Sequence, residues 1–312
     1  MDGHGPTDGK AAGLPGWLMP LLVCPECGGP VDGVAPGGGP ETEALKCGAC
    51  AVAYPVRGGI PRFVPDDDYY DSFGRQWNAF SRTQIDAFSG STESWDRFAR
   101  ETGWDRASLA DTVVLDAGCG AGRFADVALR LGARVVAVDA SSAVDACRSN
   151  LRELGHDADR YAVIQASVYA LPFRPRRFDH VYSIGVVQHT PDRPRTVASL
   201  ATQLGAGQLA LWVYERSWRS LIGYKYWFRL ATTRLSRSAT WALSTWLVRL
   251  CFPLAWSLSR VPRVGRLAVR LLPLAYDHPM TESELSRWLG AAGLEVLERR
   301  PTPGLARVAR RG

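Results

Sequence analysis

Residues 113–124 read VVLDAGCGAGRF, an apolar run that ends in Asp116 and continues into glycines at positions 118, 120 and 122. The β-branched run predicts a buried strand. Alternate glycines predict a turn in which a ligand can lie against bare backbone, because glycine has no Cβ and tolerates positive φ. Residues 124–131 continue as an amphipathic helix whose N-terminal amides and positive dipole end face that ligand. The segment therefore predicts a strand–turn–helix unit with a ligand at the turn.

The glycine spacing indicates which ligand this is. A dinucleotide fingerprint, G-x-G-x-x-G, needs its third glycine three places after the second, where this chain has Arg123. The sequence instead contains D-x-G-x-G-x-G, which resembles motif I of the class I, Rossmann-like methyltransferases that depend on S-adenosylmethionine. The resemblance implies that Asp116 helps to hold the methionine ammonium end. It also places Gly118, Gly120, Gly122 and the adjacent Arg123 in the cofactor site.

A second acid follows at a suitable distance. Residues 133–139 form another apolar run that ends in Asp139, 17 residues after Gly122, close to the roughly 20 residues expected for a ribose-binding carboxylate. A carboxylate accepts two hydrogen bonds and suits a ribose diol. The alternative is that Asp139 caps the helix expected over 142–154.

Two further strands match the same family, with departures. Residues 161–173 resemble a third strand whose family ending is G-D-A/G-x-x-L-P-F, but Ser167 stands where the family has the adenine-binding Asp. A serine hydroxyl can still bond an adenine edge, although without charge. We assign Ser167 and Val168 to the cofactor site, together with Ser183 from the fourth strand at 178–185.

His189 is the candidate general base. Residues 186–192 (VVQHTPD) resemble the family segment L-H-H-x-x-D, with Gln188 in place of the first His. An imidazole with an unperturbed pKa near 6.5 suits removal of a proton from a hydroxyl or amine acceptor. The alternative is a structural histidine that holds this loop.

Four cysteines form two C-x2-C pairs. Cys24 and Cys27 are separated from Cys47 and Cys50 by 19 residues, a spacing typical of a four-thiolate zinc site. Four cysteines close the coordination sphere, so the predicted zinc is structural. Two disulfides are the alternative, and they need an oxidising compartment. Residues 1–20 lack the positive cluster and apolar core of an export signal, so the expected location is cytoplasmic.

The sequences around the cysteines resemble the small zinc-ribbon activator subunits of methyltransferases. The similar stretches are 21–30 and 54–65. The resemblance implies that the activator's task, covering an exposed strand edge of its partner, is carried out here within one chain. We therefore expect a disordered Gly/Pro-rich leader over 1–16, a zinc ribbon over 17–65 with a loop at 35–40, and a methyltransferase domain over 66–312. A helical segment at 69–80 is expected to cover the cofactor, and the alternative is that its Trp77 and Phe80 are simply buried packing.

The positive charge of the chain is concentrated in one segment. Residues 216–276 hold 11 Lys/Arg and no Asp or Glu, although the whole chain carries only +6. Five tryptophans are interleaved with these charges, and three prolines divide the segment into short helices. We interpret it as a helical, lid-like insertion. Three functional interpretations remain: a lid over an acidic or lipid-linked substrate, a peripheral membrane contact, or a nucleic-acid surface. A basic face that is merely solvated is the alternative to all three.

The C-terminal part completes the predicted fold. Thr281 and Glu284 fit a capping box that opens a helix through Ala292, and residues 294–299 and 305–309 alternate as two strands. We expect an α/β, Rossmann-like seven-stranded methyltransferase sheet with its ligand at the carboxyl ends of the strands.

The resemblance covers roughly residues 70–215 and implies an enzyme that transfers a methyl group from S-adenosylmethionine to a small-molecule, natural-product or glycan-intermediate acceptor. One alternative is an RNA (rRNA or tRNA) methyltransferase, although only Lys46, Arg57 and Arg62 are basic between residues 21 and 64. Another is a non-catalytic protein that keeps the cofactor fold. No protein partner is predicted.

Overall fold

The computed structural model describes residues 14–36, 43–64, 78, 81–216, 239, 246, 279–302 and 304–312. The chain divides into two compact units, Met1–Tyr214 with Met280–Gly312, and Glu215–Pro279. Most of the predicted insertion at 216–276 and of the segment at 69–80 lies outside the described residues. Within the described part, no helix combines the length and apolar character needed to cross a membrane.

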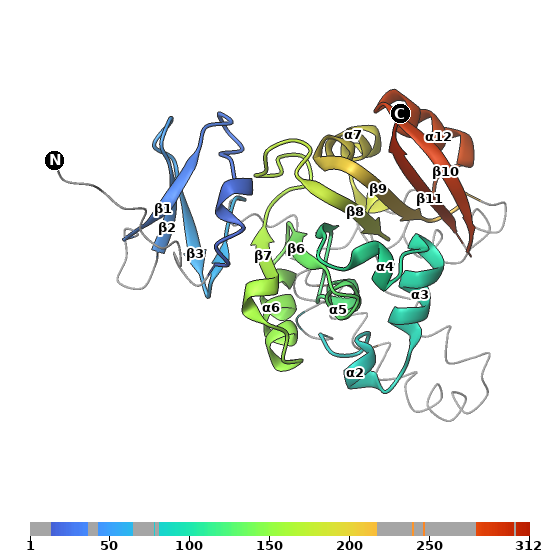
Figure 1. Cartoon of the computed structure of the whole chain (residues 1–312), viewed down its shortest axis with the longest axis horizontal. Helices are drawn as coiled ribbons and strands as arrows, with labels where there is room; N and C mark the ends of the chain where they lie inside the picture. Colours follow the sequence, from blue (N-terminus) through green and yellow to red (C-terminus); the bar gives the residue numbers. More distant parts are fainter. Residues whose placement is uncertain are drawn as a thin grey trace. The chain divides into compact units, whose positions relative to one another are not determined.

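A seven-stranded sheet forms the centre of the first unit (Figure 1). Its strands lie in the order β10-β11-β9-β8-β5-β6-β7. The five strands from β9 to β7 are parallel, whereas β11 is antiparallel to both of its neighbours. This confirms the predicted seven strands with a final antiparallel pair. The bounds are β5 (Val113–Ala117), β6 (Arg134–Asp139), β7 (Tyr161–Gln165), β8 (Phe178–Ile184), β9 (Leu204–Val213), β10 (Leu294–Pro301) and β11 (Leu305–Arg311).

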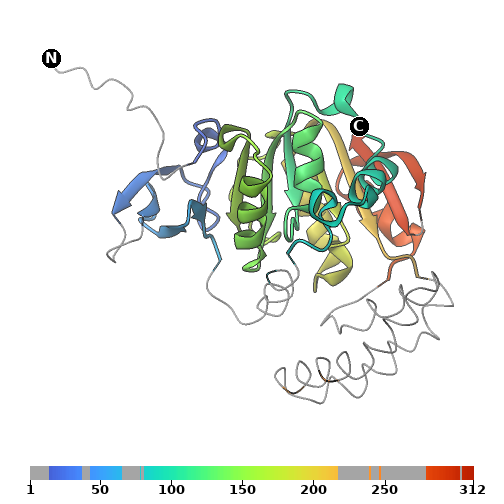
Figure 2. The same cartoon turned by 90° about the horizontal axis from the view of Figure 1, so that it is seen from below.

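Helices cover both faces of this sheet (Figure 2). The face with Val114 packs against α3 (Glu93–Thr102), α5 (Arg123–Arg130) and α6 (Ala143–Glu153). The opposite face, with Leu115, packs against α7 (Arg193–Gln203) and α12 (Glu282–Ala291). Since neighbouring residues of a strand point to opposite faces, buried strands in such a sheet are apolar throughout. The described chain also holds the short helices α2 (Asp86–Ser89) and α4 (Arg106–Leu109) and the 3-10 turns η2 (Met19–Leu21), η3 (Ala158–Arg160) and η4 (Val187–His189).

The N-terminal region forms a separate antiparallel sheet of four strands. These are β1 (Val31–Pro36), β2 (Glu43–Cys47), β3 (Ala53–Arg57) and β4 (Ile60–Pro61). The turn between β3 and β4 consists of Gly58 and Gly59, which both have positive φ, as a two-residue hairpin turn of type I′ requires. The strand β1 extends to Pro36, so the loop predicted at 35–40 begins later than expected.

The ribbon, residues 17–64, pairs with the edge of the large sheet. The Phe63 amide donates a hydrogen bond of 2.8 Å to the carbonyl of Gln165, at the end of the edge strand β7. Backbone bonds from Val23 to Pro172 (2.9 Å) and from Arg174 to Leu21 (2.8 Å) extend this contact. The expectation that the ribbon covers a strand edge in its own chain is therefore confirmed. The leader boundary is wrong, because Leu14 is buried in the apolar core.

Candidate functional site

The glycine turn after β5 has the backbone that the sequence predicts. Gly118, Gly120 and Gly122 have φ values of +90°, +52° and +88°, a backbone region that residues other than glycine rarely adopt. A Cβ at Gly118 would lie 3.0 Å from Cβ of Val186 and closer still to its methyl groups. The Gly118 and Cys119 amides donate to the Val138 carbonyl at 2.7 and 2.9 Å, which fixes the turn against β6.

Asp139 holds the same turn from the neighbouring strand. Its Oδ2 accepts a bond of 3.0 Å from the Gly120 amide, and its Oδ1 accepts from the amide and hydroxyl of Ser141 at 2.9 and 2.7 Å. The N-cap of α6 is Ser142, which makes no side-chain capping bond, so the helix-cap alternative for Asp139 is wrong. The predicted ribose acid therefore stands beside the glycines, at the carboxyl ends of β5 and β6.

Asp116 lies deeper, at 2% exposure. Burial raises its pKa to about 8, although the neighbouring Tyr182 hydroxyl acts in the opposite direction. Oδ2 of Asp116 and the hydroxyl oxygen of Tyr182 are buried without a hydrogen-bond partner among the described residues. An orphaned carboxyl oxygen below the glycine turn is the kind of atom that an ammonium group would satisfy.

Arg123 has partners that the sequence did not reveal. Its guanidinium donates to the Ser94 hydroxyl (2.8 Å) and the Gln84 side-chain oxygen (3.2 Å), and its third nitrogen lies 3.3 Å from Glu93. Two of these nitrogens thus bind the first turn of α3, and the third binds Gln84 ahead of that helix. These contacts tie α5 to α3 and give no support to the predicted cofactor contact.

The remaining predicted cofactor residues have different surroundings. The Ser167 hydroxyl accepts a bond of 3.3 Å from the Tyr169 amide, in a turn that follows β7, and the Val168 carbonyl accepts from Ser199. Both lie at the carboxyl end of the sheet, as predicted. Ser183 is fully buried and donates to the Ala117 carbonyl at 2.9 Å. Its hydroxyl therefore stabilises the pairing of β5 with β8, and its assignment to the cofactor site is not supported.

His189 ends η4, just beyond the carboxyl end of β8. Its Nε2 lies 3.4 Å from Nε2 of the buried Gln188, and its ring meets Tyr214 edge to face at 5.7 Å. Tyr214 in turn contacts Trp212 at the end of β9. The Arg97 guanidinium, from α3, lies 4.4 Å above the Trp212 ring. His189, Tyr214, Trp212 and Arg97 thus form a chain of successive contacts. Among these four residues, the sequence pattern indicates a functional role for His189 alone.

The four cysteines gather as predicted. All are free thiols, and their sulfurs lie within 4.8 Å of one another. Two pairs are close: Cys24 and Cys50 at 3.7 Å, and Cys27 and Cys47 at 3.5 Å. A zinc–sulfur bond of about 2.3 Å puts the sulfurs of a tetrahedron about 3.8 Å apart, whereas a disulfide needs about 2.05 Å. The cluster therefore fits a four-thiolate metal site and not two disulfides.

Neighbouring groups favour the thiolate at two of these four cysteines: hydrogen bonds lower the pKa of Cys24 and Cys47, whereas the nearby Cys47 sulfur raises the pKa of Cys27 and Cys50. The Tyr54 hydroxyl lies 3.0 Å from the Cys24 sulfur, and backbone amides of Gly29, Ala49 and Cys50 point at other sulfurs at 3.4 Å. Burial disfavours the Cys24 thiolate, but hydrogen bonds from the Tyr54 hydroxyl and from the backbone amides of Cys27 and Glu26 lower the pKa of Cys24 to about 6. Thiolates are the form that binds metal.

Comparisons with known proteins agree with this architecture. Residues 115–211 match the family model of a methyltransferase domain, and residues 18–59 match that of a Trm112p-like protein. A ubiquinone biosynthesis O-methyltransferase of Thiobacillus denitrificans is 36% identical over 110 residues, which cover 35% of this chain and 45% of that protein. The enzyme of the same name from Xanthomonas euvesicatoria is 35% identical over 195 residues, covering 61% and 66%.

A solved structure shares the fold. The magnesium protoporphyrin IX methyltransferase of Synechocystis, crystallised with S-adenosylhomocysteine, superposes with a TM-score of 0.50 at 17% identity, covering 78% of this chain and 97% of that one. The chain spans less than half the length of the first of the curated relatives above. The domain match, the seven-stranded sheet and the cysteine cluster together place the chain in the class I S-adenosylmethionine-dependent methyltransferase family, with a Trm112-like ribbon fused at its N-terminal side.

Proposed function

We propose that the protein transfers a methyl group from S-adenosylmethionine to a small-molecule acceptor. The observation that carries the proposal is the turn built by Gly118, Gly120 and Gly122 and held by Asp139. Three features of the site match three parts of such a ligand. The open backbone suits the chain that carries the sulfonium, the Asp139 carboxylate suits the ribose diol, and the buried Asp116 suits the ammonium group. S-adenosylmethionine would supply an activated methyl group on sulfur.

The residues of the turn would bind and orient this ligand. Oδ2 of Asp139 has a lone pair left for a ribose hydroxyl while it holds the Gly120 amide, whereas Oδ1 already accepts two bonds from Ser141. Asp116 would face the ammonium group, and Ser167 and Val168 would lie at the adenine end. Because the methyl group is already activated, the enzyme mainly has to align the acceptor at roughly 3–3.5 Å.

His189 is proposed to accept the proton of the acceptor. It lies beyond the end of β8, and Tyr214 packs against its ring. Trp212 and Arg97 would form the rest of the acceptor wall, where an aromatic ring and a guanidinium offer contacts to a planar or acidic group. The relatives named as ubiquinone O-methyltransferases favour an oxygen acceptor on a small molecule.

The ribbon is proposed to hold one structural zinc ion through Cys24, Cys27, Cys47 and Cys50. Four thiolates leave no open position for a substrate. The metal would fix a small sheet whose strands cover the edge strand β7. The protein is further proposed to act in the cytoplasm.

A labelling experiment tests the proposed reaction. Purified protein with methyl-labelled S-adenosylmethionine is incubated with a small-molecule extract, a lipid extract or total RNA. The expected result is label in a small molecule, including an acidic or lipid-linked one. His189→Gln should lower this labelling about 10²- to 10⁴-fold, the usual contribution of a general base, and leave cofactor affinity unchanged.

Two results would count against the proposal. Label in RNA alone would favour an RNA methyltransferase. Binding of S-adenosylhomocysteine without label in any fraction would favour a non-catalytic cofactor-fold protein.

A further inference from the structure

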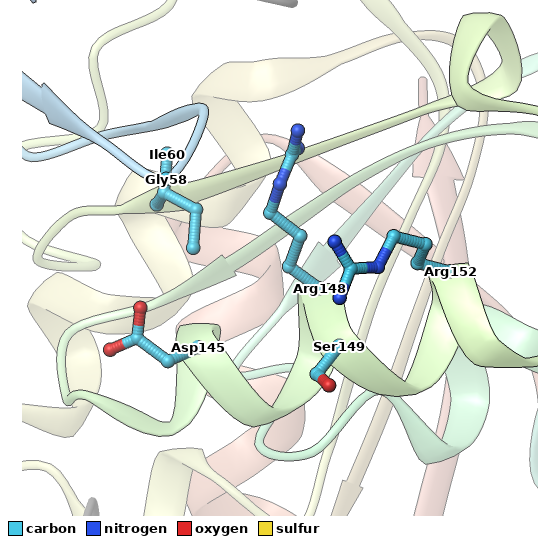
Figure 3. A pocket seen from close by; sticks show the side chains of 6 residues that line it. All are labelled: Gly58, Ile60, Asp145, Arg148, Ser149 and Arg152. Carbon is cyan, nitrogen blue, oxygen red and sulfur yellow. The ribbon is translucent and has the colours of Figure 1, made fainter.

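A small pocket lies between the ribbon and the outer side of α6 (Figure 3). It has a volume of about 170 Å³ and is lined by Gly58, Ile60, Asp145, Arg148, Ser149 and Arg152. One wall comes from the turn between β3 and β4, and the other from α6. None of these residues belongs to the glycine turn or to the cysteine cluster.

The pocket carries two arginines that make no ion pair with any acid of the described residues. Arg148 and Arg152 are four residues apart on α6, so they lie on one face of the helix, and Figure 3 shows their side chains next to each other. In the part of the chain that the structure describes, neither guanidinium makes a hydrogen bond or a salt bridge. Two adjacent positive charges without a partner favour the binding of an anion.

The carboxylate that lines this pocket, Asp145, already forms an ion pair. The Asp145 carboxylate binds the Arg62 guanidinium of the ribbon, with Nη2 to Oδ1 at 2.6 Å and Nη1 to Oδ2 at 3.5 Å. Arg62 also donates to the side chain of Gln165 at 2.7 Å. This pair is neutral as a whole, so Arg148 and Arg152 leave the pocket with a net charge of about +2.

The ribbon holds one arginine in place. Gly59 has a φ of +72° and no side chain, and the Arg148 guanidinium packs against it so closely that an added Cβ would collide with Nη2 and Cζ. Arg148 is half-buried as a result, whereas Arg152 is exposed. One guanidinium is therefore fixed between turn and helix, and the second can adjust to a ligand.

We propose that this pocket binds the phosphate group of a small phosphomonoester. A phosphomonoester carries a charge near −2 and three acceptor oxygens, which match the charge of the pocket and the paired N–H donors of arginine. The site is separate from the proposed methyl transfer. It depends on the docking of the ribbon, because the ribbon supplies both the Gly59 turn and the arginine that neutralises Asp145.

Calorimetric titration with inorganic phosphate and with glycerol phosphate, against chloride at equal ionic strength, tests this site. The zinc-loaded full chain should bind both ligands. Arg148→Gln with Arg152→Gln should weaken binding at least about tenfold, since it removes charged hydrogen bonds. The control is Lys46→Gln with Arg177→Gln, which removes the same charge from two exposed positions outside the pocket; it should bind as the parent does.

A charge-preserving variant helps to distinguish a loss of phosphate contacts from a loss of folding. Arg148→Lys with Arg152→Lys should bind more weakly than the parent and more tightly than the Gln variant, and S-adenosylhomocysteine binding reports whether each variant is folded. Equal phosphate affinity in the parent and the Gln variant would overturn the proposal. So would the absence of phosphate binding in the millimolar range, or binding confined to phosphatidic acid vesicles or RNA. None of these readouts requires methyl transfer.

Discussion

The amide of Gly120 donates a 3.0 Å hydrogen bond to Oδ2 of Asp139, across the two strands that end at the glycine turn. The bond joins two residues that the sequence pattern indicates separately: Gly120 in the turn after β5, and Asp139 at the end of β6. One carboxylate thus shapes the turn and stands ready for a ligand at it. Its removal should therefore affect both the local backbone and binding.

Asp139→Ala should weaken the binding of S-adenosylhomocysteine by about 1.5–3 kcal/mol, since charged hydrogen bonds are lost. Isothermal titration calorimetry measures this change directly. Glu43→Gln, at an exposed position of the ribbon, is the control and should bind as the parent does. Equal affinity of the Asp139 variant and the parent would remove Asp139 from the site.

Asp116→Asn should change how stability depends on pH. Burial raises the pKa of Asp116 from an ordinary 3.8 to about 8, so between these values the folded chain holds a proton that the unfolded chain has lost. The free energy of unfolding therefore falls as pH rises through this window, and the loss is complete above about 8.

Asparagine has no such proton, so the variant should be more stable than the parent at pH 8 by an amount on the order of a few kcal/mol, and similar to it near pH 4. Chemical unfolding of the zinc-loaded protein at several pH values provides the measurement. The same variant should bind S-adenosylhomocysteine more weakly, because the ammonium group loses its anion. A pH slope identical to that of the parent would contradict the buried, protonated carboxyl.

The local parts of the fold could be predicted from sequence because their causes are local. The positive φ of Gly118 and the capping box of Thr281, whose hydroxyl accepts from the Glu284 amide at 3.2 Å, each depend on a few adjacent residues. The four-cysteine cluster could be predicted for another reason, because the spacing of its two C-x2-C pairs is typical of a metal site. Periodicity likewise located the strands of the large sheet.

The surroundings of individual side chains could not be predicted in the same way. Arg97 reaches Trp212 across a long stretch of sequence, and Arg123 binds Gln84 and Ser94 from another segment. Motif resemblance placed Arg123 at the cofactor because it adjoins the glycines. Only the packing of α3 against α5 shows that its donors are used elsewhere. The burial of Leu14, well before the first cysteine, has the same non-local origin.

The ribbon should contain one zinc ion per chain, measurable by elemental analysis of protein made with ample zinc. Cys47→Ser should lose the metal and unfold the ribbon, because metal binding contributes much of the stability of so small a sheet. The large sheet should still bind S-adenosylhomocysteine, but the uncovered edge of β7 should promote aggregation. Cys251→Ser, outside the cluster, should keep its zinc. A metal-free parent protein that is folded would contradict this prediction.

Replacing Arg229, Arg234 and Arg237 together by Gln should impair methyl transfer and leave cofactor binding nearly unchanged. These residues lie outside the described part of the chain, so the prediction rests on the concentration of charge in residues 216–276. Flotation with anionic vesicles provides the contrasting measurement, because a membrane contact should be lost in high salt. Vesicle binding with unaltered turnover in the triple variant would favour a membrane role over a substrate lid.

Gly118→Ala and Gly155→Ala form a matched pair that tests the glycine turn. Both glycines have positive φ, +90° and +75°, so alanine is strained at either position. A Cβ at Gly155 meets nothing within 4 Å, whereas a Cβ at Gly118 collides with Val186. Gly155→Ala should therefore lower the free energy of unfolding through backbone strain alone, by about 1–2 kcal/mol. Gly118→Ala should lower it by about 1–3 kcal/mol more, because its Cβ overpacks the contact with Val186.

The two variants should also differ in function. Val186 directly precedes η4, which ends in His189, so a displaced Val186 should shift the proposed base as well as the glycine turn. Gly118→Ala should consequently lose both S-adenosylhomocysteine affinity and methyl transfer, while Gly155→Ala keeps both. Denaturant unfolding together with calorimetry measures the pair under one set of conditions. Equal losses of stability and affinity in the two variants would show that the contact between Gly118 and Val186 does not shape the site.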